Sequence, residues 1–167
     1  YANRPNLIWV VGGDVRADVN MELFCRMGQI AKKNSPEYLV TYHPFGRTSS
    51  TQWVKDEEWL DFNMFQSGHR RYDQASLGEW DDNANKEEFF GEDNWKYVER
   101  DYVLSSNKPT VDSEPSYEQI PQGLHDTTQP YWQDYDVRRY AYWSVFAGAM
   151  GHTYGDNSVI QLYKYPD

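Results

Sequence analysis

Short runs of apolar residues, each ending in polar or aromatic residues, recur along the chain and predict its strands. The first run, Leu7–Val11, contains no polar residue and stops at Gly12 and Gly13. Such a run is typical of a strand buried on both faces, as in a parallel sheet. The pattern predicts strands at residues 7–11, 38–42, 60–65, 109–112 and 151–155.

Apolar residues at helical spacing separate several of these strands. Over residues 20–33, one face of a predicted helix carries Leu23, Met27, Ile30 and Ala31. Further helices are predicted at residues 95–104 and 137–150, the second with Asp136 as its N-cap. The polar segment 47–53 is long for a simple connection, which favours a functional loop. The charged segment 70–91 is interpreted as an irregular surface loop.

Strands that alternate with helices and long crossovers indicate an α/β fold with parallel strands. Because every predicted strand ends in polar or aromatic residues, a (β/α) barrel is favoured over a doubly wound sheet. A complete eightfold barrel typically needs ~250 residues. The chain has 167 residues, so we expect a single partial domain over residues 1–167, with too few strands to close a barrel.

Composition narrows the possible partners. The formal net charge of −10 argues against a nucleic acid or an anionic membrane as the main partner. The 14 Tyr and 7 Trp suit stacking on sugar rings, although ordinary core packing explains them equally well. No apolar run approaches the ~20 residues of a membrane span. Cys25, the single cysteine, is interpreted as a buried, inert thiol.

Two carboxylates follow two widely separated strands. Asp14 comes after the strand at 7–11, and Glu114 comes after the strand at 109–112. Parallel α/β folds place their chemistry just past the carboxyl ends of strands, so the pair suggests acid/base or nucleophilic work on a polar substrate. Each residue alone is also explained as a turn or capping residue. Glu118 competes with Glu114 as the key carboxylate, although a supporting hydrogen bond is its commoner role.

Histidines, an amide and aromatic residues stand near the same strand ends. His43, Gln66 and His69 end or follow two predicted strands and are expected to bind substrate hydroxyls or to brace the carboxylates. Their spacing matches no metal-ligand motif, so no metal and no cofactor are predicted. Serine-hydrolase and dinucleotide-binding motifs are not present in recognisable form.

Further substrate contacts are predicted from loops and from one helix. Trp53 and Tyr117 lie in loops after strands, and Tyr154 lies near the last strand; all three are candidate sugar platforms. Arg138 is predicted in the first turn of its helix, where a cation opposes the helix dipole. We therefore expect Arg138 to have a specific partner, such as a carboxylate of the site.

Five blocks of sequence resemble a known enzyme family. They are Asn6–Asp14, Leu39–Pro44, Trp59–His69, Lys108–Glu118 and Asp136–Gly155. In this order they resemble the apiosidase-like glycoside hydrolases, similar to glycoside hydrolase family 140. These are bacterial (β/α)8-barrel enzymes, often labelled endoglucanases, that include the family acting on apiose side chains of the pectin rhamnogalacturonan II.

The resemblance implies a fold and a mechanism. It implies that the chain contains about strands four to eight of a TIM barrel, with the first three strands as a possible separate partner segment. Asp14 would then be the general acid/base and Glu114 the nucleophile. Asp14 departs from the Asn-Glu pair found at this strand end in many related barrel glycosidases. Its role as an acid is therefore implied by the resemblance to the apiosidase-like family and not by that broader pattern. The family also implies a periplasmic or extracellular location.

Two functional hypotheses follow. The first is a glycoside hydrolase that cleaves pectic side chains by a two-carboxylate mechanism, which would be retaining with the carboxyl groups roughly 5–5.5 Å apart and inverting with a gap of about 6.5–9.5 Å. The alternative is a non-catalytic carbohydrate-binding remnant of such a barrel, which binds an oligosaccharide without hydrolysing it.

Overall fold

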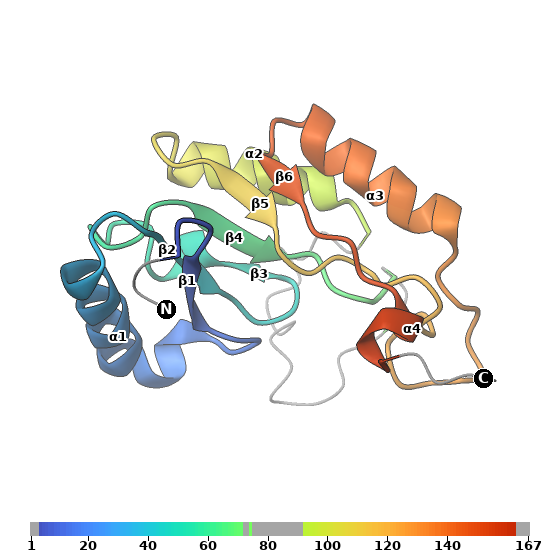
Figure 1. Ribbon diagram of the computed structural model, residues 1–167. Helices are drawn as coiled ribbons and strands as arrows, with labels where there is room; N and C mark the ends of the chain where they lie inside the picture. Colours follow the sequence, from blue (N-terminus) through green and yellow to red (C-terminus); the bar gives the residue numbers. More distant parts are fainter. Residues whose placement is uncertain (1–3, 72–73, 75–91, 163–167) are drawn as a thin grey trace.

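The computed structural model describes residues 4–71, 74 and 92–162. Strands and helices alternate along the chain except where β3 directly follows β2 (Figure 1). In chain order the strands and α-helices are β1 (Ile8–Gly12), α1 (Met21–Asn34), β2 (Leu39–His43), β3 (Thr48–Ser49), β4 (Asn63–Gln66), α2 (Asn94–Leu104), β5 (Thr110–Asp112), α3 (Asp134–Phe146), β6 (Gly151–His152) and α4 (Asn157–Ile160), with short 3-10 helices at Ala17–Asn20 and Ser50–Gln52.

Five of the strands run parallel in chain order. β1 pairs with β2, β4 pairs with β5, and β5 pairs with β6, all in parallel register. The two groups meet between β2 and β4, where Asp61 N–H donates to Val40 O at 2.9 Å and Thr41 Oγ1 donates to Phe62 O at 2.8 Å. This arrangement confirms the predicted parallel α/β fold and is consistent with part of a TIM barrel. That these strands are about strands four to eight of such a barrel stays a prediction.

Helix α1 packs on the sheet through a different face from the predicted one. A Cβ at Gly28 would collide with the Trp59 ring, so the glycine lets the helix approach that side chain. Around this contact, residues Met21, Phe24, Cys25 and Ala31 pack against a core that includes Val11, Val40 and Tyr42. The predicted face is corrected accordingly: Leu23, Met27 and Ile30 are exposed, because the smallest residue and not the most apolar stripe marks the closest approach.

Strand β1 also departs from its prediction. Its residues Ile8, Trp9 and Val10 are exposed, so the expected burial on both faces is wrong within the described part of the chain. The physical reason is that β1 has one partner strand here, β2, and only Val11 points into the cluster that α1 covers.

Helix α3 begins earlier and ends earlier than predicted. Gln133 is its N-cap, and the Gln133 N–H donates to Asp136 Oδ2 at 3.1 Å, so Asp136 is the third helical residue and not the cap. Arg138 therefore lies in the second turn. The helix stops at Phe146, just before Gly148, whose φ of 109° breaks the helical path. Helices α2 and α3 lie together over β5 and β6 (Figure 1).

The polar segment 47–53 is part of the buried framework. β3 runs antiparallel to β4, with Thr48 opposite Gln66 and Ser49 opposite Phe65, so the chain descends toward the amino-terminal end of β4. Ser50 and Thr51 are buried there, and Thr51 Oγ1 donates to Asp101 Oδ1 at 2.8 Å. The polarity that favoured a functional loop is used in these internal hydrogen bonds.

Most of the predicted surface loop at residues 70–91 lies outside the described residues. None of the helices in the described part of the chain is long and apolar enough to cross a membrane.

Candidate active site

Asp14 and Glu114 occupy equivalent positions on two strands. Each lies two residues beyond the last residue of its strand, Gly12 for β1 and Asp112 for β5. Gly12 has a φ of 85°, and a Cβ there would lie 2.8 Å from His43 O, so glycine is needed at this crossing. The turn after β1 leaves Asp14 itself at a φ of 54°, a conformation that costs energy for a residue other than glycine.

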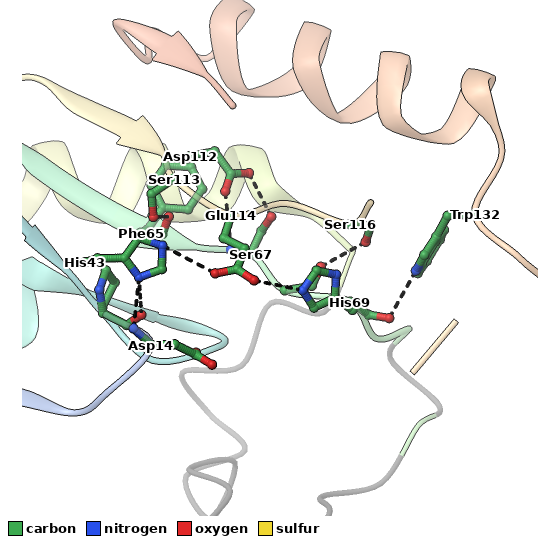
Figure 2. A network of polar contacts seen from close by, with 12 residues as sticks. Asp14, His43, Phe65, Ser67, His69, Asp112, Ser113, Glu114, Ser116 and Trp132 are labelled. Atoms are coloured by element: carbon green, nitrogen blue, oxygen red, sulfur yellow. Dashed lines mark hydrogen bonds and ion pairs between the residues drawn. The ribbon is translucent and has the colours of Figure 1, made fainter. Parts of the chain in front are cut away.

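His43, the last residue of β2, connects the two positions. Its Nδ1 lies 3.2 Å from the backbone N of Asp14, and its Nε2 lies 3.4 Å from Glu114 Oε2 (Figure 2). A neutral ring carries one N–H, and a carboxylate requires a donor. The tautomer that suits both contacts therefore carries its proton on Nε2, facing Glu114 Oε2, and accepts from the Asp14 N–H at Nδ1. Pro44 O, 3.1 Å from Nδ1, then receives no hydrogen bond from the ring.

Glu114 is held as a carboxylate. His69 Nε2 lies 3.2 Å from its Oε1, and Tyr117 also hydrogen-bonds to it. Burial alone would raise the pKa of Glu114, but the hydrogen bonds from His69 and Tyr117 and the two nearby imidazoles outweigh burial and lower the pKa below its ordinary value. The ring of Tyr117 packs edge-on against His69 at a centroid distance of 4.5 Å.

The pKa of Asp14 is shifted in the opposite direction. Partial burial and the negative charge of Glu114 raise its pKa above the ordinary value, and a hydrogen bond from Gln66 only partly offsets them. Two interacting carboxyl groups whose pKa values are pushed apart can act as a proton donor and an ionised group at the same pH. The directions of the two shifts therefore favour Asp14 as the proton donor and Glu114 as the ionised nucleophile or base.

The two carboxyl groups open into one pocket of about 150 Å³. Sequence reasoning predicted Asp14, Gln66, His69 and Glu114 among its lining residues but missed several others. These additional residues are Phe45, Gly46, Arg47, Gly68, Arg70, Leu124 and His125. Arg47 is buried and has a φ of 64°, and its backbone N–H donates to Gln66 O at 2.7 Å. Arg47 begins the segment 47–53, whose length and polarity predict a functional loop, but the hydrophobic pattern does not single out this residue within it.

The structure divides the other predicted site residues between two further places. Glu118, Arg138 and Tyr154 line a second hollow between α3 and β6, where Tyr154 Oη donates to Glu118 Oε2 at 2.8 Å. Arg138 forms an exposed ion pair with Asp134 at 3.3 Å, so the expected partner in the catalytic site is replaced by a neighbour on its own helix. Trp53 packs against the core cluster beyond the amino-terminal end of β4, so it does not join Asp14 and Glu114.

No group of three or more His, Cys, Asp or Glu side chains among the described residues is arranged to hold a metal ion.

Comparison with known proteins identifies the family. The family model described as "Apiosidase-like, catalytic domain" matches residues 1–167. The chain belongs to this family.

Two solved structures are similar to the chain. One, titled "Glycoside hydrolase", is 50% identical with a TM-score of 0.88, and the match covers 100% of this chain and 37% of that one. The other, a glycoside hydrolase family 5 protein from Bacteroides vulgatus ATCC 8482, is 48% identical with a TM-score of 0.86, covering 96% and 33%. The apiosidase-like chain thus spans about a third of the length of these proteins. No curated protein matches it.

Proposed function

We propose that this apiosidase-like chain carries the catalytic pair of a retaining glycoside hydrolase, with Asp14 as general acid/base and Glu114 as nucleophile. The observation that carries the proposal is the opposite displacement of the two pKa values within one pocket, upward for Asp14 and downward for Glu114. An acid that stays protonated beside a carboxylate that stays ionised is what the first step of glycoside cleavage needs.

The reaction proceeds in two balanced steps. In the first, a Glu114 oxygen forms a bond to the anomeric carbon while the glycosidic C–O bond breaks and the Asp14 proton passes to the leaving oxygen. In the second, the Asp14 carboxylate takes a proton from water, the water oxygen bonds to the anomeric carbon, and the ester to Glu114 breaks. The hydrogen bond from His69 and the nearby His43 ring favour Glu114 as the leaving carboxylate in this step.

The substrate is a side chain of a plant cell-wall, pectic polysaccharide. Family membership supports this class. His43, Gln66, His69 and Tyr117 surround the carboxyl pair and are proposed to bind the sugar that is cleaved. Glu118, Arg138 and Tyr154 are proposed to contact a more distant part of the glycan from the second hollow.

The proposal is tested in the complete natural polypeptide that contains this chain, on a panel of pectic and other plant-wall oligosaccharides. We expect hydrolysis by the wild type, a loss of about 10²–10⁴-fold in kcat for Asp14→Asn, and a larger loss for Glu114→Gln. Asp126→Asn, a change at an exposed turn, is the control. Full activity of Glu114→Gln would refute the mechanism. Binding of a glycan by the wild type without hydrolysis would favour a carbohydrate-binding protein instead.

A further inference from the structure

Asp112 lies behind Glu114 and takes no part in the mechanism above. It is the last residue of β5, two residues before Glu114, and its side chain is fully buried. A carboxyl group that is removed from water requires compensating hydrogen bonds. The identity of its partners therefore indicates what this costly group does.

The shortest hydrogen bond of Asp112 reaches the segment that follows β4. Ser67 Oγ donates to Asp112 Oδ2 at 2.7 Å, and the Ser67 N–H points at Oδ1 from 3.4 Å (Figure 2). Asn94 of α2 lies 3.4 Å from Oδ2 through Nδ2, and His152 of β6 lies 4.0 Å away through Nδ1. Asp112 thus meets groups from three neighbouring elements and also accepts from the backbone N–H of Glu114. Its shortest side-chain contact is with Ser67.

Ser67 stands between two residues that touch the catalytic pair. Gln66 hydrogen-bonds to Asp14, and His69 contacts Glu114 at 3.2 Å. The same segment is attached to the β5 end at Gly68, whose N–H donates to Glu114 O at 3.1 Å and whose O accepts from Ser116 Oγ at 2.9 Å. A shift of Ser67 therefore moves the donors of both catalytic carboxyl groups.

We propose that Asp112 is a positioning residue that, through Ser67, fixes the segment from Gln66 to His69 and so sets the hydrogen bonds on Asp14 and Glu114. The inference rests on the proposed function of that pair. Asp112 itself does not contact the pocket, since it is fully buried and the pocket is lined by other residues.

The cost of burying Asp112 supports this role. Burial raises the pKa of Asp112 to about 7, although Ser67 and Asn94 hydrogen-bond to it. His152 offers no compensating positive charge at neutral pH, because burial lowers its pKa to about 4. A buried carboxyl group that is only partly compensated is an expensive way to stabilise a turn, and an apolar residue would fill the same space at lower cost.

The test compares two serine substitutions in the complete natural polypeptide. Ser67→Ala removes the hydroxyl that Asp112 binds. Ser113→Ala removes a hydroxyl that donates to Phe65 O at 2.9 Å and also joins β5 to β4, but does not bind the segment from Gln66 to His69. The two changes are chemically matched, and both sites are buried.

We expect Ser67→Ala to lower kcat about ten- to a hundredfold, as a small misplacement of catalytic groups does, with KM changed less. The acidic limb of the pH profile of kcat/KM moves to higher pH, because a displaced His69 no longer lowers the pKa of Glu114 fully. Ser113→Ala leaves kcat and the acidic limb unchanged, whatever its effect on the melting temperature. Ser67→Thr, which keeps the hydroxyl, restores the wild-type acidic limb.

Two outcomes would overturn the positioning role of Asp112. If Ser67→Ala keeps the wild-type kcat and acidic limb, or if Ser113→Ala moves them equally, Asp112 has a purely structural role. Should Ser67→Ala fail to fold, the acidic limb of Asp112→Leu gives the same decision, since this change of similar size removes the oxygen that accepts from the Ser67 hydroxyl. Glu114→Gln, assayed in parallel, separates failure of this inference from failure of the proposed function. Its loss of activity upholds the nucleophile whatever Ser67→Ala does.

Discussion

Nε2 of His43 lies 3.4 Å from Oε2 of Glu114, so a residue of β2 stabilises the ionised carboxyl group that follows β5. The same ring accepts the Asp14 N–H through Nδ1 at 3.2 Å. One imidazole therefore fixes the relative placement of both catalytic positions.

Replacing His43 is expected to move the acidic limb of activity. His43→Ala removes the ring whose electrostatic effect lowers the pKa of Glu114, so kcat/KM falls about tenfold or more and its acidic limb moves to higher pH. His43→Gln, which offers an amide donor near the same place, is expected to recover part of the loss. A pH profile of kcat/KM for the three proteins checks this. An unmoved acidic limb in His43→Ala would contradict the assigned contact.

The pH dependence of activity follows from the signs of the two pKa shifts. Glu114 must be ionised, and its pKa lies below the ordinary value, which sets the acidic limb. Asp14 must be protonated, and its pKa lies above the ordinary value, which sets the alkaline limb. With an aryl glycoside whose leaving group needs no protonation, Asp14→Asn is expected to abolish the alkaline limb of the first step. Persistence of that limb in Asp14→Asn would assign it to another group.

The stability of the fold is expected to depend on pH through Asp112. Its pKa of about 7 exceeds the ordinary value, so between about pH 4 and pH 7 the folded state binds a proton that the unfolded state has lost. The stabilisation is present below this window and is lost as the pH rises through it. His152, with a pKa lowered to about 4, has the opposite slope up to its ordinary value of about 6.5.

Comparison with Asp112→Asn isolates this contribution. The difference in free energy of unfolding between the wild type and Asp112→Asn should fall by on the order of 2–3 kcal/mol from pH 5 to pH 8. Chemical denaturation followed by tryptophan fluorescence measures it. The corresponding difference for Asp126→Asn, whose pKa is lowered by Thr128, stays constant over this range. A constant difference for Asp112→Asn as well would show that Asp112 is ionised throughout.

Gly155 is expected to be required for the position of Tyr117. A Cβ at Gly155 would collide with the Tyr117 ring, whose hydroxyl hydrogen-bonds to Glu114. Gly155→Ala should therefore destabilise the fold by about 1–3 kcal/mol and lower kcat. Gly151→Ala is the matched control, since its Cβ would meet only Val111 Cγ2 at an ordinary 3.6 Å. If Gly155→Ala and Gly151→Ala change kcat equally, the position of Tyr117 does not matter for catalysis.

The strands and the candidate carboxylates could be predicted from the sequence because local signals encode both. Apolar runs that stop at polar residues mark β1 and β2, the short stretch around Val111 before Glu114 and Pro115 marks β5, and parallel strands deliver the residues after them to one edge. The direction of the helix α1 face could not be predicted, because Gly28, the point of closest approach, counts as neither polar nor strongly apolar.

Other features depended on contacts that are distant in sequence. The descent of β3 along β4 buries Thr51 against Asp101, fifty residues away, so the polar segment gave no sign of its internal role. The start of α3 was set by Gln133 and Asp136 acting together, which moved Arg138 out of the first turn. The pairing of Asp112 with Ser67 likewise joins two strand ends that no local pattern connects.

The configuration of the product formed with azide tests the assignment of the catalytic pair most directly. Glu114→Gly in the complete natural polypeptide, given azide and the aryl glycoside that the wild type cleaves fastest, is expected to release a glycosyl azide of inverted configuration, because azide replaces the missing nucleophile. Asp14→Gly under the same conditions is expected to give a glycosyl azide of retained configuration, because azide attacks the ester at Glu114. NMR of the two products decides. Exchanged configurations, or retained product from Glu114→Gly, would contradict the account.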